Sequence, residues 1–390
     1  MYSNKKTIIE KLANYESKLR PTLIKMPSSL VTMLYSKARK NFMSAFVKAK
    51  LNERHIPTST KVKLWDIDFN CGLINAAGMF KNGEGYYTCA KMGAGAFLAG
   101  TTTLQPRKGN RSLFCNHPFA SYVNAHSASN WMGLPNIGHL AVANTISKIE
   151  KIRNCPIGIS IASNPELDDN EKVKGVLEGF KIFEKVANVD FIELNSSCPN
   201  VTVDKIVDNT SEDLECNKLD TNIIDKLTFF SKNFLKKRTR HLPVVVKYSN
   251  DIQTEILPQL IDLLIDLDFD GIVLGNTSTD YDRYAIYFTG YDRILFNYFI
   301  KKYGGGLSGE ILKDRSLFLS KFATSYIQKK NLSKEFHCIR VGGISLYEDI
   351  VASNKAGVLL NQWFTGFWEK FAQNGFDTYK RIFSRVIDNL

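Results

Sequence analysis

The 390-residue chain lacks the features that mark membrane-spanning, disulfide-rich or zinc-binding proteins. No stretch approaches the roughly eighteen apolar residues that a transmembrane helix needs, and residues 1–11 lack the apolar core of a signal peptide. The seven cysteines, at positions 71, 89, 115, 155, 198, 216 and 338, form no CxxC pair and no zinc-type spacing with the six histidines. We therefore expect an intracellular protein in a reducing compartment, with no metal site and no disulfide framework.

Two nucleotide-binding signatures are also missing. The glycines fit neither the P-loop pattern nor a GxGxxG motif that opens a βαβ unit, which argues against ATP, and against NAD held in the Rossmann manner. Two glycine clusters are present, Gly304-Gly-Gly-Leu-Ser-Gly309 and Val341-Gly-Gly343, the second between an apolar run and a helix that begins near Ser345. Amides exposed at a strand end and a helix N-terminus can hold a phosphate. A tight turn would explain either cluster alone; together, without a nucleotide fingerprint, they indicate FMN.

Acidic residues are scarce at the start of the chain. Residues 1–60 contain twelve Lys/Arg and three Asp/Glu, so about nine of the twelve net positive charges lie in the first sixth of the sequence. The remainder is nearly balanced. This distribution is typical of a surface anchor and unlike a groove that follows nucleic-acid phosphates, so we expect no nucleic-acid partner.

Within this basic segment, residues 28–51 have the hydrophobic spacing of a helix, with apolar side chains recurring from Leu30 to Ala49. The opposite face is basic and carries Lys37, Arg39, Lys40, Lys48 and Lys50. Pro21 and Pro27 interrupt a weaker helix over residues 6–19. Two compatible interpretations stand: a helical hairpin that caps the rest of the protein, or a basic amphipathic helix on a membrane surface. We expect residues 1–58 to form this extension and residues 59–390 to form the catalytic domain.

Beyond residue 60, short β-rich runs alternate with helical stretches. We predict eight strands, at residues 72–76, 96–100, 156–161, 191–195, 243–247, 271–275, 337–341 and 358–362, and helices at 177–187, 252–267 and 317–329. This alternation predicts an α/β fold, a (βα)8 TIM barrel with a small N-terminal helical extension; an open doubly wound sheet is the alternative. Chemistry in such barrels lies at the C-terminal strand ends. The unusual residues gather there: Asn75, Thr101, Asn195, Lys247, Asn276, Gly342 and Gly343.

The segment Glu193-Leu-Asn-Ser-Ser-Cys-Pro-Asn200 places a thiol and two amides directly after a predicted strand. A buried structural cysteine is the alternative, but the polar loop favours a reactive Cys198, because a thiol with a pKa of about 8.5 can accept a carbon-bound proton. Asn136 and Asn276 lie at a predicted turn and strand end. Neutral amides suit a uracil-like ring. Lys247 ends a strand and needs an anionic partner, such as a flavin ring that carries negative charge when reduced.

Taken in order, these motifs resemble the dihydroorotate dehydrogenases over roughly residues 60–385. The resemblance rests on Asn75-Ala-Ala-Gly-Met-Phe-Lys-Asn-Gly-Glu84, Gly100-Thr-Thr-Thr, Lys108-Gly-Asn110, Met132-Gly-Leu-Pro-Asn136, Glu193 to Asn200, Val246-Lys247, Asn276-Thr277, Gly305-Gly-Leu-Ser-Gly309 and Val341-Gly-Gly343. It implies a βα barrel that holds FMN and oxidises (S)-dihydroorotate to orotate in de novo pyrimidine (UMP) synthesis.

The resemblance also implies site residues. Cys198 matches the base that removes the C5 proton, while the C6 hydride passes to flavin N5. The substrate clamp matches Lys81, Asn136, Asn195, Asn200 and Asn276. The positions around FMN match Ala77, Gly78, Thr101, Ser160, Lys247, Thr277, Gly309, Gly343 and Thr365.

Features of two subclasses of this family conflict in the chain. A cysteine base is typical of the soluble class 1 enzymes, which pass electrons to fumarate or, through an iron–sulfur partner, to NAD. The N-terminal extension, the loop over residues 75–84 and the glycine at position 100 resemble class 2 enzymes, which reduce membrane quinone. Asn110-Arg-Ser-Leu lacks the proline-arginine run that class 2 enzymes place near the quinone. The balance favours a quinone-reducing enzyme, peripheral on a membrane surface.

Three alternatives remain open. The first is a soluble, cytoplasmic, fumarate-linked dihydroorotate dehydrogenase whose extension serves as a cap. The second is a tRNA-modifying FMN barrel similar to dihydrouridine synthases, which the N-terminal location of the basic charge disfavours. The third is a non-catalytic scaffold, which the complete set of site motifs disfavours.

Overall fold

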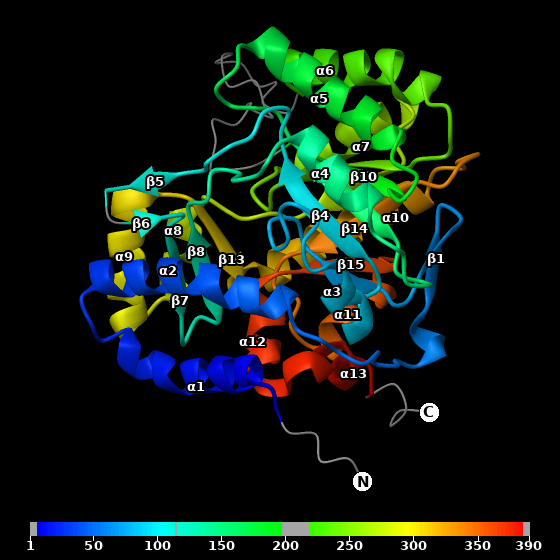
Figure 1. The fold of residues 1–390 in the computed structure, drawn as a ribbon. Coiled ribbons are helices and arrows are strands. Elements are labelled where there is room, and N and C mark those ends of the chain that lie inside the picture. Colours follow the sequence, from blue (N-terminus) through cyan, green and yellow to red (C-terminus); the bar gives the residue numbers. More distant parts are fainter. Residues whose placement is uncertain (1–5, 114, 197–218, 385–390) are drawn as a thin grey trace.

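The computed structural model describes residues 6–113, 115–196 and 219–384 (Figure 1). Eight parallel strands form one sheet in the order β3-β15-β14-β12-β11-β10-β9-β4. Their bounds are β3 Leu73–Asn75, β4 Phe97–Thr102, β9 Ile157–Ile161, β10 Phe191–Asn195, β11 Val244–Tyr248, β12 Gly271–Leu274, β14 His337–Val341 and β15 Leu360–Trp363. Each of the eight predicted strands is confirmed. The predicted parallel barrel is confirmed as well, and the alternative of an open doubly wound sheet is not.

The Asn75 side chain closes the barrel between β3 and β4, the two strands at the ends of the sheet order. Its Nδ2 donates to the Leu98 carbonyl at 2.7 Å, and its Oδ1 accepts from the Leu98 N–H at 3.0 Å. The Gly95 N–H donates to the Leu73 carbonyl below this pair. Asn75 is fully buried, so both halves of its amide replace ladder hydrogen bonds that would otherwise be lost at the seam.

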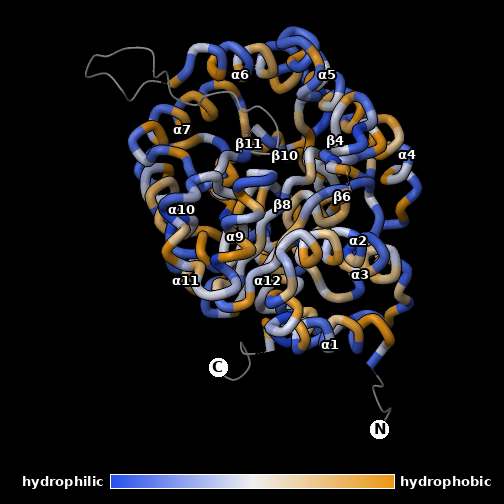
Figure 2. The backbone as a smooth tube through the Cα atoms, turned by 90° about the vertical axis from the view of Figure 1, so that its left-hand side faces the viewer, coloured by the Kyte–Doolittle hydropathy of each residue, from blue (hydrophilic) through white to orange (hydrophobic). Residues whose placement is uncertain are grey.

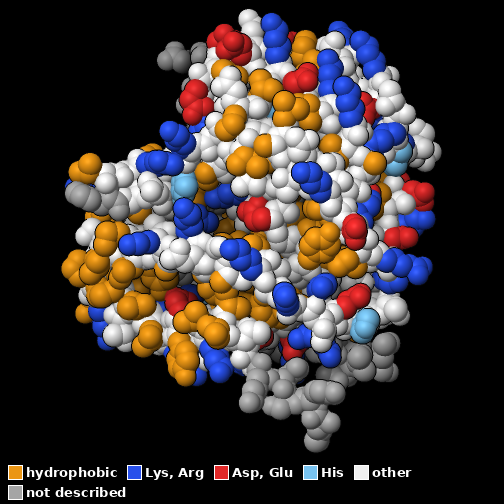
Figure 3. All heavy atoms as spheres, viewed as in Figure 1, with side chains coloured by type: hydrophobic (Ala, Val, Ile, Leu, Met, Phe, Trp, Pro, Cys, Tyr) orange, Lys and Arg blue, Asp and Glu red, His pale blue; other side chains and the backbone are white. Residues whose placement is uncertain are grey.

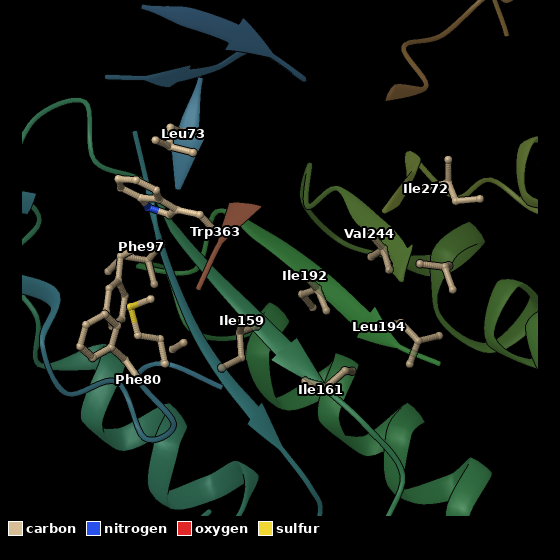
Figure 4. Close-up of a cluster of buried hydrophobic side chains, with 14 of the residues drawn as sticks. Leu73, Phe80, Phe97, Ile159, Ile161, Ile192, Leu194, Val244, Ile272 and Trp363 are labelled. Carbon is tan, nitrogen blue, oxygen red and sulfur yellow. The ribbon is translucent and has the colours of Figure 1, made fainter. Parts of the chain in front are cut away.

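Helices surround the barrel. They are α3 Tyr86–Met92, α4 His139–Ser147, α5 Asp169–Glu184, α6 Thr221–Asn233, α7 Leu257–Asp266, α10 Lys313–Gln328, α11 Tyr347–Lys355, α12 Thr365–Asn374 and α13 Thr378–Phe383. The helices predicted at 177–187, 252–267 and 317–329 correspond to α5, α7 and α10. Strand side chains such as Ile192, Leu194 and Val244 point outward against this layer (Figure 4). Phe191 and Val245 point inward, because successive strand residues face opposite sides.

Smaller elements cover the two ends of the barrel. The hairpin β1 Val62–Leu64 and β2 Ile67–Phe69 brings Trp65 and Phe69 against the inward-facing strand side chains. At the other end lie β7 Phe119–Tyr122, β8 Ser127–Asn130 and β13 Gly306–Gly309, an antiparallel sheet, with α8 Tyr281–Tyr284 and α9 Gly290–Tyr303 beside it. The hairpin β5 Arg111–Ser112 and β6 Cys115–Asn116 projects next to them (Figure 1).

The N-terminal extension consists of α1 Ile8–Leu23 and α2 Ser28–Val47. The predicted end of the first helix at residue 19 is wrong, because Pro21 lies inside its last turn. A proline so close to a helix end removes one hydrogen bond, and the Ile24 N–H still bonds to the Arg20 carbonyl. Figure 2, turned by 90°, places α1 near the C-terminal helices, and the Asn14 amide donates to the Ala372 carbonyl of α12 at 3.1 Å.

The predicted division of α2 into an apolar and a basic face is wrong in part. Leu30 and Leu34 are exposed, whereas Arg39 turns inward and its Nε is buried. The reason is that α2 has neighbours on several sides, namely α1, β7 and α9. None of the helices in the described ranges is both long and apolar enough to cross a membrane.

Candidate active site

A cavity of about 130 Å³ opens at the C-terminal ends of the barrel strands. We call it the barrel-mouth cavity. Most of the predicted site residues line it: Ala77, Gly78, Lys81, Thr101, Asn195, Lys247, Asn276, Thr277, Gly309, Gly343 and Thr365. They come from separate stretches of the chain, and the parallel barrel brings them together because all its strands end at the same side.

Lys247 is held at this cavity by two residues that the sequence did not indicate. Its Nζ lies 3.3 Å from Glu193 Oε1 and donates to Gln362 Oε1 at 2.9 Å. Gln362 Nε2 donates in turn to Glu193 Oε2 at 2.6 Å. All three side chains are almost fully buried inside the barrel. The signal was available: Glu193 interrupts an apolar strand between Ile192 and Leu194, at an inward-facing position.

A row of hydrogen bonds links side chains from the C-terminal regions of four strands. Asn276 Nδ2 donates to Asn195 Oδ1 at 3.2 Å, and Asn195 Nδ2 donates to Thr101 Oγ1 at 3.1 Å. Thr101 Oγ1 lies 3.0 Å from Ser160 Oγ. Ser160 is therefore behind Thr101 and does not line the cavity, although it supports a residue that does.

The Asn136 side chain bonds to its own loop and to residues at the end of β4. Its Oδ1 accepts hydrogen bonds from Thr102 Oγ1 and from the backbone N–H groups of Thr103 and Gly138. Its Nδ2 donates to Thr103 Oγ1 and the Leu134 carbonyl. With both ends of its amide bonded to the protein, Asn136 holds the loop that carries it and lies beside the barrel-mouth cavity rather than in its wall.

One end of the cavity is built from backbone. Gly342 and Gly343 follow β14, and Thr365 and Gly366 begin α12. A Cβ on Gly343, whose φ is +72°, would lie 2.4 Å from Lys313 Cα, and one on Gly366 would lie 2.1 Å from the Ile344 carbonyl oxygen. Only glycine fits these positions, and the first amides of α12 have no partners within the helix. This backbone cradle suits a phosphate group.

The remaining donors fit a flavin ring next to such a phosphate. Thr277 Oγ1 is buried, lines the cavity, and has no hydrogen-bond partner among the described residues. Lys247 supplies a buried positive charge. An orphaned hydroxyl and a cation beside an anion cradle are the donor set that the polar edge and phosphate of FMN require.

Lys81 and Arg39 bring positive charge to the side of the cavity that faces α2. Burial, reinforced by the nearby Arg39, holds the pKa of Lys81 well below its usual range. Burial also lowers the pKa of Arg39 to about 10, and its Nη2 lies 3.3 Å from Met132 Sδ. Two desolvated cations side by side favour an anion between them, because a carboxylate would neutralise their repulsion.

Cys198 and Asn200 lie outside the described residues. The chain enters their segment from Ser196, whose N–H donates to the Lys247 carbonyl at 3.1 Å. Asn195, at the end of β10, lines the cavity directly before it.

A second, apolar pocket lies between α1, α2 and α12. Its walls are mainly apolar: Leu12, Ala13, Phe42, Met43, Met79, Trp368, Phe371 and Ala372. Arg39, Phe119, Phe364 and Thr365 line both this apolar pocket and the barrel-mouth cavity. A hydrophobic molecule in the pocket would therefore end beside the proposed flavin position.

The family model described as dihydroorotate dehydrogenase matches residues 59–390. The chain belongs to the dihydroorotate dehydrogenase family. Membership of this family makes it a flavin-dependent oxidoreductase with an α/β barrel, in agreement with the fold expected from the sequence.

Curated relatives and solved structures agree with this assignment. The chain is 27% identical over 365 residues to dihydroorotate dehydrogenase (quinone) of Christiangramia forsetii, covering 90% of this chain and 94% of that one. It is 28% identical to the protein of the same name from Aliivibrio fischeri, with 79% and 83% covered. A crystal structure of DHODH from Eimeria tenella in complex with ferulenol has a TM-score of 0.70 at 19% identity, with 90% of each chain covered. That structure supports the shared fold.

Proposed function

We propose that this protein oxidises (S)-dihydroorotate to orotate at the barrel-mouth cavity and passes the electrons to a quinone in the apolar pocket. The observation that carries the proposal is the contact between the two spaces: a polar cavity with a phosphate cradle and an apolar pocket share Arg39 and Thr365. A flavin that takes two electrons from polar dihydroorotate and passes them to a hydrophobic quinone needs a polar space and an apolar space next to each other.

The substrate is a small anion with a neutral imide ring. Lys81 attracts its carboxylate, and Asn195 and Asn276 bond to the ring through the amides that now bond to each other. Asn200 completes this clamp and Cys198 takes the C5 proton. Asn136 contributes by fixing the loop beside Thr102. Removal of the C5 proton and the C6 hydride forms the C5–C6 double bond and gives orotate as the product.

The cofactor we propose is FMN. Gly343 and Thr365 hold its phosphate, while Thr277, Thr101 and Lys247 face its ring, with Ala77, Gly78 and Gly309 forming close backbone walls and Ser160 supporting Thr101. When bound, FMN supplies the acceptor for the hydride from C6. Glu193 keeps Lys247 in place at the ring edge, which stabilises negative charge there.

The quinone acceptor is supported by the names of the relatives and by the apolar pocket. Its ring would approach Arg39, whose buried Nε has no hydrogen-bond partner in the described part of the chain. That guanidinium can donate to a quinone carbonyl. Arg39 lies on α2. The extension would therefore supply the guanidinium near the quinone in place of the proline-arginine run that the Asn110-Arg-Ser-Leu segment lacks.

A membrane surface is the natural source of such a quinone. Apolar side chains of α1 stand in solvent, with Ile8 78% and Leu12 57% exposed, and Leu34 of α2 is exposed as well. Figure 3 shows hydrophobic side chains gathered at the lower left, over α1, the start of α2 and α9. We propose that residues 1–58 contact lipid through this face and that residues 59–390 form the catalytic domain.

A soluble, fumarate-linked enzyme is the second candidate, favoured by the cysteine at position 198. Fumarate is polar and small, so it would react within the barrel-mouth cavity and would not need the apolar pocket. The two candidates therefore differ in whether blocking that pocket affects turnover.

The test is Ala13→Phe, which fills the apolar pocket from α1. We expect it to slow reduction of a short-chain quinone by tenfold or more while dihydroorotate still reduces the bound flavin at the wild-type rate. Ala352→Phe on α11, at a position that does not line the pocket, is the matched control. Equal quinone rates in wild type and Ala13→Phe, with fumarate the better acceptor, would contradict the quinone assignment.

A further inference from the structure

A wide hollow on the surface of the molecule carries positive charge, because all but one of the charged side chains that line it are Lys or Arg. It lies between α2 and the segment that includes the β5–β6 hairpin. Its basic residues are Lys37, Arg39, Lys40, Lys81, Arg107, Lys108 and Arg111, and Glu84 is the carboxylate in its wall. In Figure 3, Lys and Arg side chains surround a recess above α2, with a histidine at its rim. We call this space the basic hollow.

The basic hollow adjoins the barrel-mouth cavity. Arg39, Lys81 and Pro135 line both spaces. A small molecule that enters the hollow from solvent therefore reaches the two partly desolvated cations of the candidate active site without crossing the apolar pocket.

The charge of the hollow is little compensated. Glu84 accepts hydrogen bonds from the backbone N–H groups of Lys81 and Asn82, and Arg107 pairs with Glu166. Among the residues that the structure describes, the exposed Lys37, Lys40, Lys108 and Arg111 form no ion pair. Their fields therefore add within the hollow.

We propose that the basic hollow is the access route of the substrate, and that its four exposed cations steer the dihydroorotate carboxylate toward Lys81. This inference rests on the proposed function. A concave surface lined by one sign of charge concentrates counter-ions and can raise association rates by about 10- to 1000-fold at low ionic strength. Screening over a Debye length of about 10 Å at 0.1 M salt weakens this effect.

The test neutralises the steering charges without touching the site. The variant carries Lys37→Gln, Lys40→Gln, Lys108→Gln and Arg111→Gln, all at exposed positions. The control removes four exposed lysines from α5, from α10 and from the C-cap of α10: Lys174→Gln, Lys181→Gln, Lys321→Gln and Lys329→Gln. For each protein, the rate of flavin reduction is measured against dihydroorotate concentration at several ionic strengths.

At low salt we expect the second-order rate constant of the hollow variant to fall about tenfold, with its salt dependence largely lost. The limiting rate at saturating dihydroorotate should match wild type, because Lys81 and the amides are unchanged. The control should retain both the rate constant and its salt dependence. Equal losses in both variants, or none in the hollow variant, would overturn the steering role.

Two further outcomes separate this inference from others. If dihydroorotate does not reduce the wild-type flavin at all, the proposed function fails. If the hollow variant keeps its second-order rate constant but no longer binds anionic phospholipid vesicles, the hollow contacts membrane headgroups and the steering inference is overturned.

Discussion

At the scale of single residues, Lys247 depends on its buried partners. A cation inside a barrel is costly unless a carboxylate and further acceptors surround it, and Glu193 and Gln362 provide these. The Glu193→Gln variant keeps the size of the side chain but removes the carboxylate charge that Lys247 contacts. We expect the flavin-free protein to lose about 3 kcal/mol of unfolding free energy in chemical denaturation.

A double variant controls for this interpretation. Glu193→Gln combined with Lys247→Met removes both charges, and it should recover much of the lost stability because no unpaired charge remains. If the double variant is as unstable as the sum of the two single variants, the two side chains are not coupled and the explanation fails.

His139 gives the protein a predictable response to acid. The ring is fully buried against Phe183, and burial lowers the pKa of His139 to about 4. Between pH 6.5 and 4 the unfolded chain binds a proton that the folded chain refuses, so stability falls as pH decreases through this window. The expected loss is about 3 kcal/mol across the window.

The measurement is the free energy of unfolding at several pH values for wild type and His139→Phe. The variant should lack the loss of stability attributed to this histidine between pH 6.5 and 4, whatever its stability at neutral pH. His55→Gln, at an exposed position, is the control and should follow wild type. An unchanged pH profile in His139→Phe would show that another group is responsible.

The location of a site residue could be predicted from the sequence where the residue ends a strand, but the direction of its side chain could not. Asn195, Lys247 and Asn276 end strands, and strand ends converge in a barrel, so their common location was predictable. The direction in which a turn residue points was not: Asn136 faces its own loop because Thr103 and Gly138 offer it partners. Glu193 was missed because its role depends on Lys247, which lies 54 residues further along the chain on the neighbouring strand β11.

At the scale of elements, α2 is joined to the barrel by an aromatic cluster. Phe46 is fully buried, with its ring centroid 5.2 Å from those of Trp368 and Phe371 and 6.0 Å from that of Phe80. Removing the extension would uncover these rings. The extension is therefore part of the folded core as well as a candidate lipid-binding surface.

Phe46→Ala tests this attachment. Truncating a buried phenylalanine typically costs about 3–5 kcal/mol, so we expect a loss of that size in the unfolding free energy. Leu34→Ala, on the exposed side of α2, should change stability by less than about 0.5 kcal/mol. Similar, small effects of both substitutions would mean that α2 contributes little to the stability of the protein.

The elements were predictable where their pattern is local. Eight apolar runs with helical stretches between them specified the eight strands, because each run is short and bounded by turn residues. The boundaries of α1 and the inward turn of Arg39 were not predictable, because both are decided by packing against α12, β7 and α9. The antiparallel sheet β7-β8-β13 joins segments more than 170 residues apart, and neither segment indicates the other.

At the scale of the whole molecule, three spaces meet at Arg39. The barrel-mouth cavity holds the polar chemistry, the apolar pocket opens between the helices of the extension, and the basic hollow leads in from solvent. An anionic substrate and a hydrophobic acceptor could thus approach one flavin by separate routes. This separation would account for an extension that is both basic and apolar.

The most direct test of this account is anaerobic reduction and reoxidation of the purified, FMN-loaded protein, followed by flavin absorbance. We predict that dihydroorotate bleaches the flavin and that a short-chain quinone restores the colour faster than fumarate at equal concentration. A flavin that dihydroorotate leaves oxidised, or one that fumarate reoxidises faster than quinone, would contradict the account.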